Sequence, residues 1–175
     1  MQKKIVEILR TGRIGVLPTD TLYGLVGSAF SRKAISRIYK TRKRDRRKPF
    51  IILISSLGDL NKFNVRLTSK EKAITNRLWP GKVSIVLRGK AFRLPRKKSL
   101  VSLLKKTGPL VAPSANLSGQ KPAKNITQAK KYFGDKVDFY VSAGKLSGKP
   151  STLIELKNGK IKILRSGSVK INFLK

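Results

Sequence analysis

Residues 109–119 read PLVAPSANLSG, an apolar segment that leads directly into small polar residues and a glycine. The apolar part is typical of a buried strand, and Pro113 fixes the backbone where the strand ends. If the chain stays extended beyond it, Ser114 and Asn116 project to the same side, and Gly119 lets the backbone turn away. Small hydroxyl and amide groups beside a glycine can approach phosphate oxygens closely. This stretch therefore predicts an anion site at the end of a strand.

Helical and strand-like segments alternate on both sides of this strand. Helical spacing or capping signals occur at 3–10, 31–40, 68–79, 99–106 and 127–133, and short apolar runs typical of strands occur at 14–18, 50–54, 83–87, 109–112 and 137–141. Ser31 is a candidate N-cap, and Thr68 with Glu71 forms a candidate capping box. Asn158-Gly159 predicts a terminal β-hairpin, which makes the sheet mixed. We expect a single α/β domain over residues 1–175, with a mixed sheet flanked by helices.

The composition excludes many chemistries. The 175 residues contain no cysteine and no histidine, which excludes thiol nucleophiles, Ser-His-Asp triads and zinc sites built from thiolates or imidazoles. The eight acids are scattered, without the spacing of a carboxylate metal cage. The N-terminus is charged where a signal peptide needs an apolar core, and no apolar run is long enough to span a membrane. We expect a soluble, cytoplasmic protein with no membrane partner, whose chemistry uses cations and backbone groups.

The chain is strongly basic. Lysine and arginine number 41, which gives a formal charge of +33 and predicts attraction to polyanions, with nucleic acid as the natural partner. The alternative is that the basicity only keeps the protein soluble. The densest run, KTRKRDRRK at 40–48, is either a solvated loop or an anion-binding segment. Arg42 and Arg44 can grip one anion together only if the helix has ended by then, because residues two apart on a helix face different ways.

A third distinctive stretch is PTDTLYGL at 18–25. Its alternate residues Thr19, Thr21 and Tyr23 lie on one side if the chain is extended. The alternative is an ordinary turn into a core segment.

Seven motifs, taken in order, resemble those of the YrdC family of threonylcarbamoyl-AMP synthases. They are PTDTLYGL, RKR at 42–44, WPG at 79–81, RLP at 93–95, PSANLSG at 113–119, STLIEL at 151–156 and LRSG at 164–167. The resemblance implies a twisted mixed sheet, similar to that of dihydroxybutanone phosphate synthase, with a large basic cavity on one face. It also implies a nucleotidyltransferase that converts L-threonine, bicarbonate and ATP into L-threonylcarbamoyladenylate, pyrophosphate and water. The product serves the N6-threonylcarbamoyl modification of adenosine in tRNA.

The resemblance also implies the site residues. It assigns phosphate positioning to Arg42, Arg44, Ser114 and Asn116, ATP binding to these four with Lys48 and Arg165, and threonine binding to Thr21, Arg93, Ala112 and Ser151. The family's Lys-x-Arg pair fits Lys40 and Arg42 literally. The spacing from Thr21 favours Arg42 and Arg44, where arginine replaces the usual lysine. Arg93 follows an unusually short connection from WPG, and the alternative is that it is a surface cation.

The implied reaction needs alignment and neutralised charge more than a protein nucleophile. We expect Mg²⁺ to arrive with ATP, because it bridges phosphate oxygens and needs no carboxylate cage. No residue is assigned as general acid or base. Contact with tRNA is a partner hypothesis, and other proteins of the modification pathway are expected to act downstream. The competing hypotheses are a non-catalytic RNA-binding module of the same fold and a carbamoyl-transfer domain like that of hydrogenase maturation proteins. The missing cysteine-rich zinc segments disfavour the second.

Overall fold

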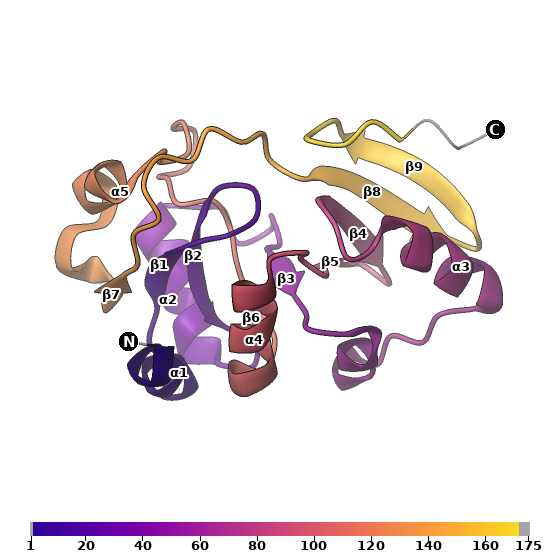
Figure 1. Cartoon of the computed structure of the whole chain (residues 1–175), viewed down its shortest axis with the longest axis horizontal. Helices are drawn as coiled ribbons and strands as arrows, with labels where there is room; N and C mark the ends of the chain where they lie inside the picture. Colours follow the sequence, from indigo (N-terminus) through magenta and orange to yellow (C-terminus); the bar gives the residue numbers. More distant parts are fainter. Residues whose placement is uncertain (1, 172–175) are drawn as a thin grey trace.

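A computed structural model describes residues 2–171, and in this part of the chain nine strands form one mixed sheet (Figure 1). The strands are β1 (Gly15–Pro18), β2 (Tyr23–Ser28), β3 (Ile51–Leu53), β4 (Val83–Leu87), β5 (Lys90–Arg93), β6 (Leu110–Val111), β7 (Phe139–Tyr140), β8 (Thr152–Lys157) and β9 (Lys160–Arg165). Their order across the sheet is β7-β1-β2-β6-β3-β5-β4-β8-β9. The pairs β1–β7, β3–β5 and β4–β8 are parallel, and the other pairs are antiparallel. The mixed sheet expected from the sequence is confirmed.

The helices lie close to their predicted positions. They are α1 (Gln2–Arg10), α2 (Arg32–Arg42), α3 (Ser69–Leu78), α4 (Lys98–Thr107) and α5 (Ile126–Phe133), with short 3₁₀ helices η1 (Leu57–Phe63) and η2 (Gly134–Lys136). The Ser31 hydroxyl accepts a hydrogen bond from the Ala34 N–H, and Thr68 and Glu71 form the expected capping box. None of the helices within residues 2–171 is long and apolar enough to cross a bilayer.

The half of the sheet that contains β1, β2 and β6 is covered on both faces. Because side chains alternate along a strand, Val16 and Leu25 point to one face while Leu17 and Val26 point to the other. The first face packs against α2 and α5 through a cluster that includes Ala34, Ile38, Ala129 and Phe133. The second packs against α1 and α4 through Val6, Leu9, Leu100, Leu103 and Leu104. Figure 1 shows these four helices around this half of the molecule.

The other half of the sheet, with β4, β5 and β8, is covered on one face by α3 and η1 (Figure 1). The side chains that pack there are Val83, Ile85, Leu87, Phe92, Ile154 and Leu156. The alternate positions point to the opposite face, and they are Ser84, Val86, Ala91, Arg93, Leu153 and Glu155. The sheet therefore offers an open face on which a cleft can form.

Two tight hairpins shape this open face. Asn158 and Gly159 join β8 to β9 with φ angles of +53° and +74°, which confirms the predicted terminal hairpin. Arg88 and Gly89 join β4 to β5 in the same way, with φ angles of +51° and +76°. The sequence did not indicate this second hairpin. It accounts for the short connection between WPG and RLP, and it brings Arg93 directly to the open face.

Candidate functional site

A cleft of about 490 Å³ occupies the open face of the sheet. Its walls come from the β1–β2 turn, the loop after α2, strands β4 and β5, the loop after β6, and the β8–β9 hairpin. Six cationic side chains line it, and they are Arg42, Arg44, Arg47, Lys48, Arg93 and Arg165. Of the residues assigned from the sequence, all line the cleft except Asn116. Arg47 is a cleft residue that the sequence analysis did not assign.

The end of α2 delivers Arg42 and Arg44 to the cleft. The helix ends at Arg42, and Lys43 adopts the left-handed conformation with φ of +50°. Arg44 therefore lies beyond the helix, which is the condition for Arg42 and Arg44 to contact one anion together. Arg42 is buried, and its guanidinium donates to the carbonyl and side-chain oxygens of Asn116 at 2.9 and 3.0 Å. Burial, with help from the nearby Arg44, lowers the pKa of Arg42 to about 10. Lys40 is exposed and lies outside the cleft lining.

Asn116 differs from its sequence-based assignment. The loop is not extended, because the Asn116 N–H donates to the Ser114 carbonyl at 3.0 Å and closes a three-residue turn. The Ser114 hydroxyl donates to Asn116 Oδ1 at 2.6 Å. Both amide hydrogens of Asn116 are donated to main-chain carbonyls, those of Leu117 and Gln120 at 2.8 Å. Asn116 therefore has no donor left for a phosphate, and it instead positions Arg42 and Ser114.

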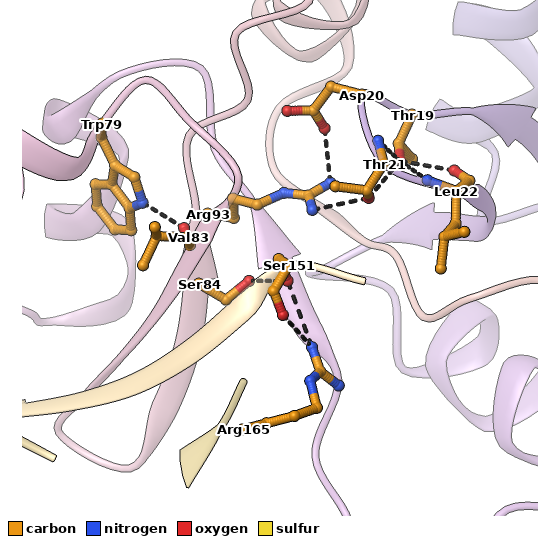
Figure 2. Close-up of polar contacts among 10 residues, drawn as sticks. All are labelled: Thr19, Asp20, Thr21, Leu22, Trp79, Val83, Ser84, Arg93, Ser151 and Arg165. Carbon is orange, nitrogen blue, oxygen red and sulfur yellow. Dashed lines mark hydrogen bonds and ion pairs between the residues drawn. The ribbon is translucent and has the colours of Figure 1, made fainter. Parts of the chain in front are cut away.

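The PTDT segment is a tight turn between β1 and β2. The side chains of Thr19 and Thr21 are therefore brought together by this turn and not by an extended chain. The Thr19 hydroxyl donates to the Leu22 carbonyl at 2.7 Å and accepts from the N–H groups of Thr21 and Leu22, as Figure 2 shows. The Thr19 and Thr21 hydroxyl oxygens lie 3.1 Å apart. Such side-chain bonds to the backbone fix a turn. Thr21 is therefore held rigidly at the cleft.

Arg93 is buried at the end of β5, with only 4% of its surface exposed, so it is not a surface cation. Its Nη1 donates to Thr21 Oγ1 at 3.0 Å, and its Nη2 lies 2.9 Å from Asp20 Oδ1 (Figure 2). Burial lowers the pKa of Arg93, the Asp20 carboxylate opposes this, and Arg165 adds to the lowering. In the sequence, Asp20 is one of the eight scattered acids. Its place between two turn threonines was the one local signal.

Ser151 and Arg165 form a second hydrogen-bonded group in the cleft (Figure 2). Arg165 Nη2 donates to the Ser151 carbonyl at 2.8 Å, and the Ser151 and Ser84 hydroxyl oxygens lie 2.8 Å apart. Burial lowers the pKa of Arg165, and Arg44 lowers it further. Ser84 was missed by sequence reasoning. The only signal in the sequence was a serine between the apolar residues of the strand VSIVL. In the structure this serine is fully buried.

The WPG and RLP motifs shape the wall beside Arg93. The Trp79 indole N–H donates to the Val83 carbonyl at 2.7 Å (Figure 2), and the Gly81 N–H donates to the Leu94 carbonyl at 2.9 Å. A Cβ atom on Gly81 would lie 2.6 Å from the carbonyl oxygen of Leu78, so only glycine fits without a shift of the backbone. These motifs hold the backbone around Arg93 in place.

The fold and the cleft define a class, an α/β protein whose mixed sheet carries a cleft lined by cationic side chains on one open face. The model of the Sua5/YciO/YrdC family, described by the words "Telomere recombination", matches residues 7–167. The chain belongs to this family, and the resemblance found in the sequence is confirmed.

Three relatives illustrate the match. The threonylcarbamoyl-AMP synthase of Hahella chejuensis is 30% identical, over 91% of this chain and 95% of that protein. Pyrococcus abyssi Sua5, solved in complex with L-threonine, is 26% identical with a TM-score of 0.83. That alignment covers 95% of this chain and 54% of the other, so the chain spans about half of Sua5. Escherichia coli YciO has a TM-score of 0.88 at 22% identity, over 100% of this chain and 94% of that one, and it supports the fold alone.

Proposed function

We propose that this protein is a threonylcarbamoyl-AMP synthase, a nucleotidyltransferase that forms L-threonylcarbamoyladenylate from L-threonine, bicarbonate and ATP. Family membership supports this, because the Hahella chejuensis relative bears that name and the Pyrococcus abyssi structure holds L-threonine. The observation that carries the proposal is the cleft itself. It gathers residues that six of the seven sequence motifs had assigned to ATP and to threonine.

The cleft chemistry suits a reaction between anions. In the proposed reaction, the threonine amine takes up carbon dioxide from bicarbonate, and a carbamate oxygen then attacks the α-phosphorus of ATP. The new P–O bond forms as the bond to pyrophosphate breaks. Arg42, Arg44 and Lys48 would neutralise the phosphates, because cations that the fold holds in place need no reorganisation as charge develops. Arg93 beside Thr21 would hold the amino acid.

Magnesium is proposed as part of the ATP substrate. Within the described residues no group of three acid, histidine or cysteine side chains is placed to hold a metal ion. Phosphate oxygens and water are the usual ligands of Mg²⁺ in nucleotide sites, so the metal can enter with its nucleotide. The role of this chain is then to position the phosphates around the ion.

Product formation with each substrate omitted in turn tests the proposal. The expected result is that purified protein releases pyrophosphate and forms the mixed anhydride only when ATP, L-threonine and bicarbonate are all present. Ser114→Ala should lower this rate about ten-fold or more, because it removes the hydroxyl that donates to Asn116 Oδ1 and helps to hold Arg42 in the cleft. Ser102→Ala, which removes a half-buried serine hydroxyl on α4 outside the cleft, is the matched control. Pyrophosphate release that does not depend on threonine would contradict the proposal.

The charge of +33 supports a second candidate, a non-catalytic RNA-binding module. Such a module would bind RNA with an affinity that falls steeply as salt rises, and it would not turn over nucleotide. The two functions can also coexist, since the proposed pathway ends on tRNA. Turnover in the wild-type protein excludes the non-catalytic module, and Ser114→Ala should then lower turnover about ten-fold or more while RNA affinity stays intact.

A further inference from the structure

Phe30 is an exposed aromatic residue in the turn between β2 and α2. Its surface is 55% exposed, the largest value among the large apolar residues that the structure describes. The Ser31 N–H donates to the Ser28 carbonyl and the Phe30 N–H donates to the Ser28 hydroxyl, both at 3.3 Å, so the turn has a fixed shape. A single exposed apolar side chain is common and needs no function. The contacts of its ring distinguish Phe30 from such a residue.

The Phe30 ring is the outer member of a series of three aromatic rings. It stacks on Phe63 of η1, with ring centroids 4.9 Å apart and an angle of 18° between the ring planes. Phe63 in turn contacts Phe92 edge-on, at 5.2 Å and 65°, and Phe92 is fully buried in the core. Because Phe63 covers one face of the Phe30 ring, the exposed surface lies mainly on the other face. The fold therefore presents an aromatic face that the core supports from behind.

Cationic side chains lie next to this ring in the sequence, and exposed acids do not. Arg32 and Lys33 are exposed in the first turn of α2, which contains no acid. The two segments that supply the stacked rings, 28–36 and 57–66, contain one acid, Asp59. The Asp59 side chain is only 7% exposed and is paired to a lysine of η1 at 2.7 Å. The surface around the ring is therefore positive, and it attracts anions.

A flat aromatic face beside cations suits a nucleotide whose base is unpaired. The base is a planar π system that stacks on an aromatic ring, and the phosphates carry the charge that basic side chains neutralise. The bases of a duplex are already stacked on one another, so the ring favours a single strand or a loop. An apolar protein segment would contact the ring but gain nothing from the cations. A second copy of this chain, also at +33, would be repelled.

This surface is separate from the cleft. Tyr23 and Gly24, at the start of β2, line the cleft, whereas Phe30 follows the end of the same strand. The strand runs for five residue steps from Tyr23 to Ser28, or about 17 Å. Neither Phe30 nor Phe63 is among the residues that line the cleft. A ligand on the ring therefore leaves the cleft open.

We propose that Phe30, supported by Phe63, is a stacking site for an unpaired base of single-stranded RNA, with the phosphates of the same strand against Arg32 and Lys33. The inference does not rest on the proposed enzymatic function, because the site shares no residue with the cleft. It assigns part of the attraction to nucleic acid, which the charge of +33 predicts, to one surface. Base stacking there adds a contact that charge alone does not supply.

Binding of a short single-stranded oligoadenylate to full-length variants tests the stacking contact, at about 0.2 M salt to weaken nonspecific phosphate contacts. Phe30→Ala should lower the affinity about ten-fold. Phe30→Leu should lower it equally, because leucine is apolar but has no aromatic face, and Phe30→Trp should retain it. Ile163→Ala is the matched control, since Ile163 is 47% exposed, lies on β9 and is not among the residues that line the cleft. It should bind like the wild type.

An abasic strand of the same length separates stacking from phosphate contacts. It should bind to the wild type and to Phe30→Ala equally, because it has no base to stack. Replacing Arg32 and Lys33 by glutamine should weaken binding of both strands. It should also reduce the slope of log affinity against log salt by about 1.4, since each phosphate contact on a single strand contributes about 0.7. Duplex RNA of the same length should show no effect of Phe30→Ala.

Several results would overturn the inference. Phe30→Ala or Phe30→Leu that binds oligoadenylate like the wild type would show that no base stacks on the ring. Equal loss of the abasic strand in Phe30→Ala would show that the ring acts only through phosphates or the fold. A wild-type dimer that Phe30→Ala disrupts would assign the surface to protein contact instead. Product formation should be unchanged in Phe30→Ala, so a wild-type protein that forms no product would overturn the proposed function alone.

Discussion

Asn116 makes four side-chain hydrogen bonds, and all four go to the protein. Asn116→Ala would leave the Leu117 and Gln120 carbonyls and the buried Arg42 guanidinium without these partners. We expect it to lower the free energy of unfolding by about 1–3 kcal/mol. Activity should fall with it, because Arg42 and Ser114 lose their orientation. Urea unfolding and turnover assays measure the two effects.

Asn61→Ala is a suitable control for that change, because Asn61 is exposed in η1 and is not among the residues that line the cleft. It should change the free energy of unfolding by less than about 0.5 kcal/mol. If Asn116→Ala lost activity with full stability, Asn116 would contact the substrate directly and the positioning role assigned to it would be wrong.

The sequence could predict the cleft residues that stand in motifs, but not the contacts that organise them. Thr21, Ser114 and Arg165 were found because their neighbours form recognisable motifs. Arg93 reaches Thr21 across 72 residues of sequence, and Ser84 reaches Ser151 across 67. No local spacing reveals such pairs, since they depend on the strand order of the sheet. Asp20 was missed for the same reason.

At the scale of elements, Glu71 joins helix α3 to the β4–β5 hairpin. It completes the capping box with Thr68, and its fully buried carboxylate accepts two hydrogen bonds from Arg88 at 2.7 and 2.9 Å. The Arg88 bonds, with a backbone bond from Thr68, lower the pKa of Glu71 from about 4.5 to about 2. A carboxylate with a lowered pKa in the folded state stabilises the fold above its unfolded pKa. That stabilisation is lost as the pH falls from about 4.5 to about 2.

We therefore expect Glu71→Gln to lower the free energy of unfolding at neutral pH by up to about 3 kcal/mol. The difference between wild type and variant should shrink below pH 4.5 and nearly vanish near pH 2. Urea unfolding at a series of pH values measures it, and the subtraction removes the effects of the other acids. Two stability curves that stay parallel down to pH 2 would contradict the prediction.

Elements with local signals were predicted well, and those without were missed. Helices α2 and α3 have caps in the sequence, and the β8–β9 turn has Asn-Gly. The strand β2, YGLVGS, contains two glycines, which weaken a strand signal. Gly27 is there because α2 packs closely on β2, and a Cβ atom on it would lie 3.0 Å from the Ala34 Cβ. The Arg-Gly turn between β4 and β5 has a first residue that seldom adopts positive φ, so it gave no hairpin signal.

At the scale of the whole molecule, the charge balance opposes compaction. The formal charge is +33, while the described residues form five ion pairs. Most cations therefore repel one another, and folding brings them closer together than they are in the unfolded chain. Two of the cations that line the cleft, Arg42 and Arg93, are also buried, which adds a desolvation cost. The cleft thus concentrates charge that a bound anion would offset.

Added salt should therefore stabilise this protein. Raising NaCl from about 0.01 M to about 0.15 M shortens the screening length from about 30 Å to about 8 Å, which weakens long-range repulsion more than the short ion pairs. We expect the free energy of unfolding to rise by an amount on the order of 1 kcal/mol. Urea must be the denaturant, because guanidinium chloride is itself a salt. Sodium sulfate at equal ionic strength should stabilise more than NaCl if anions also bind in the cleft. A urea midpoint that falls as NaCl rises would mean that the ion pairs outweigh the repulsion.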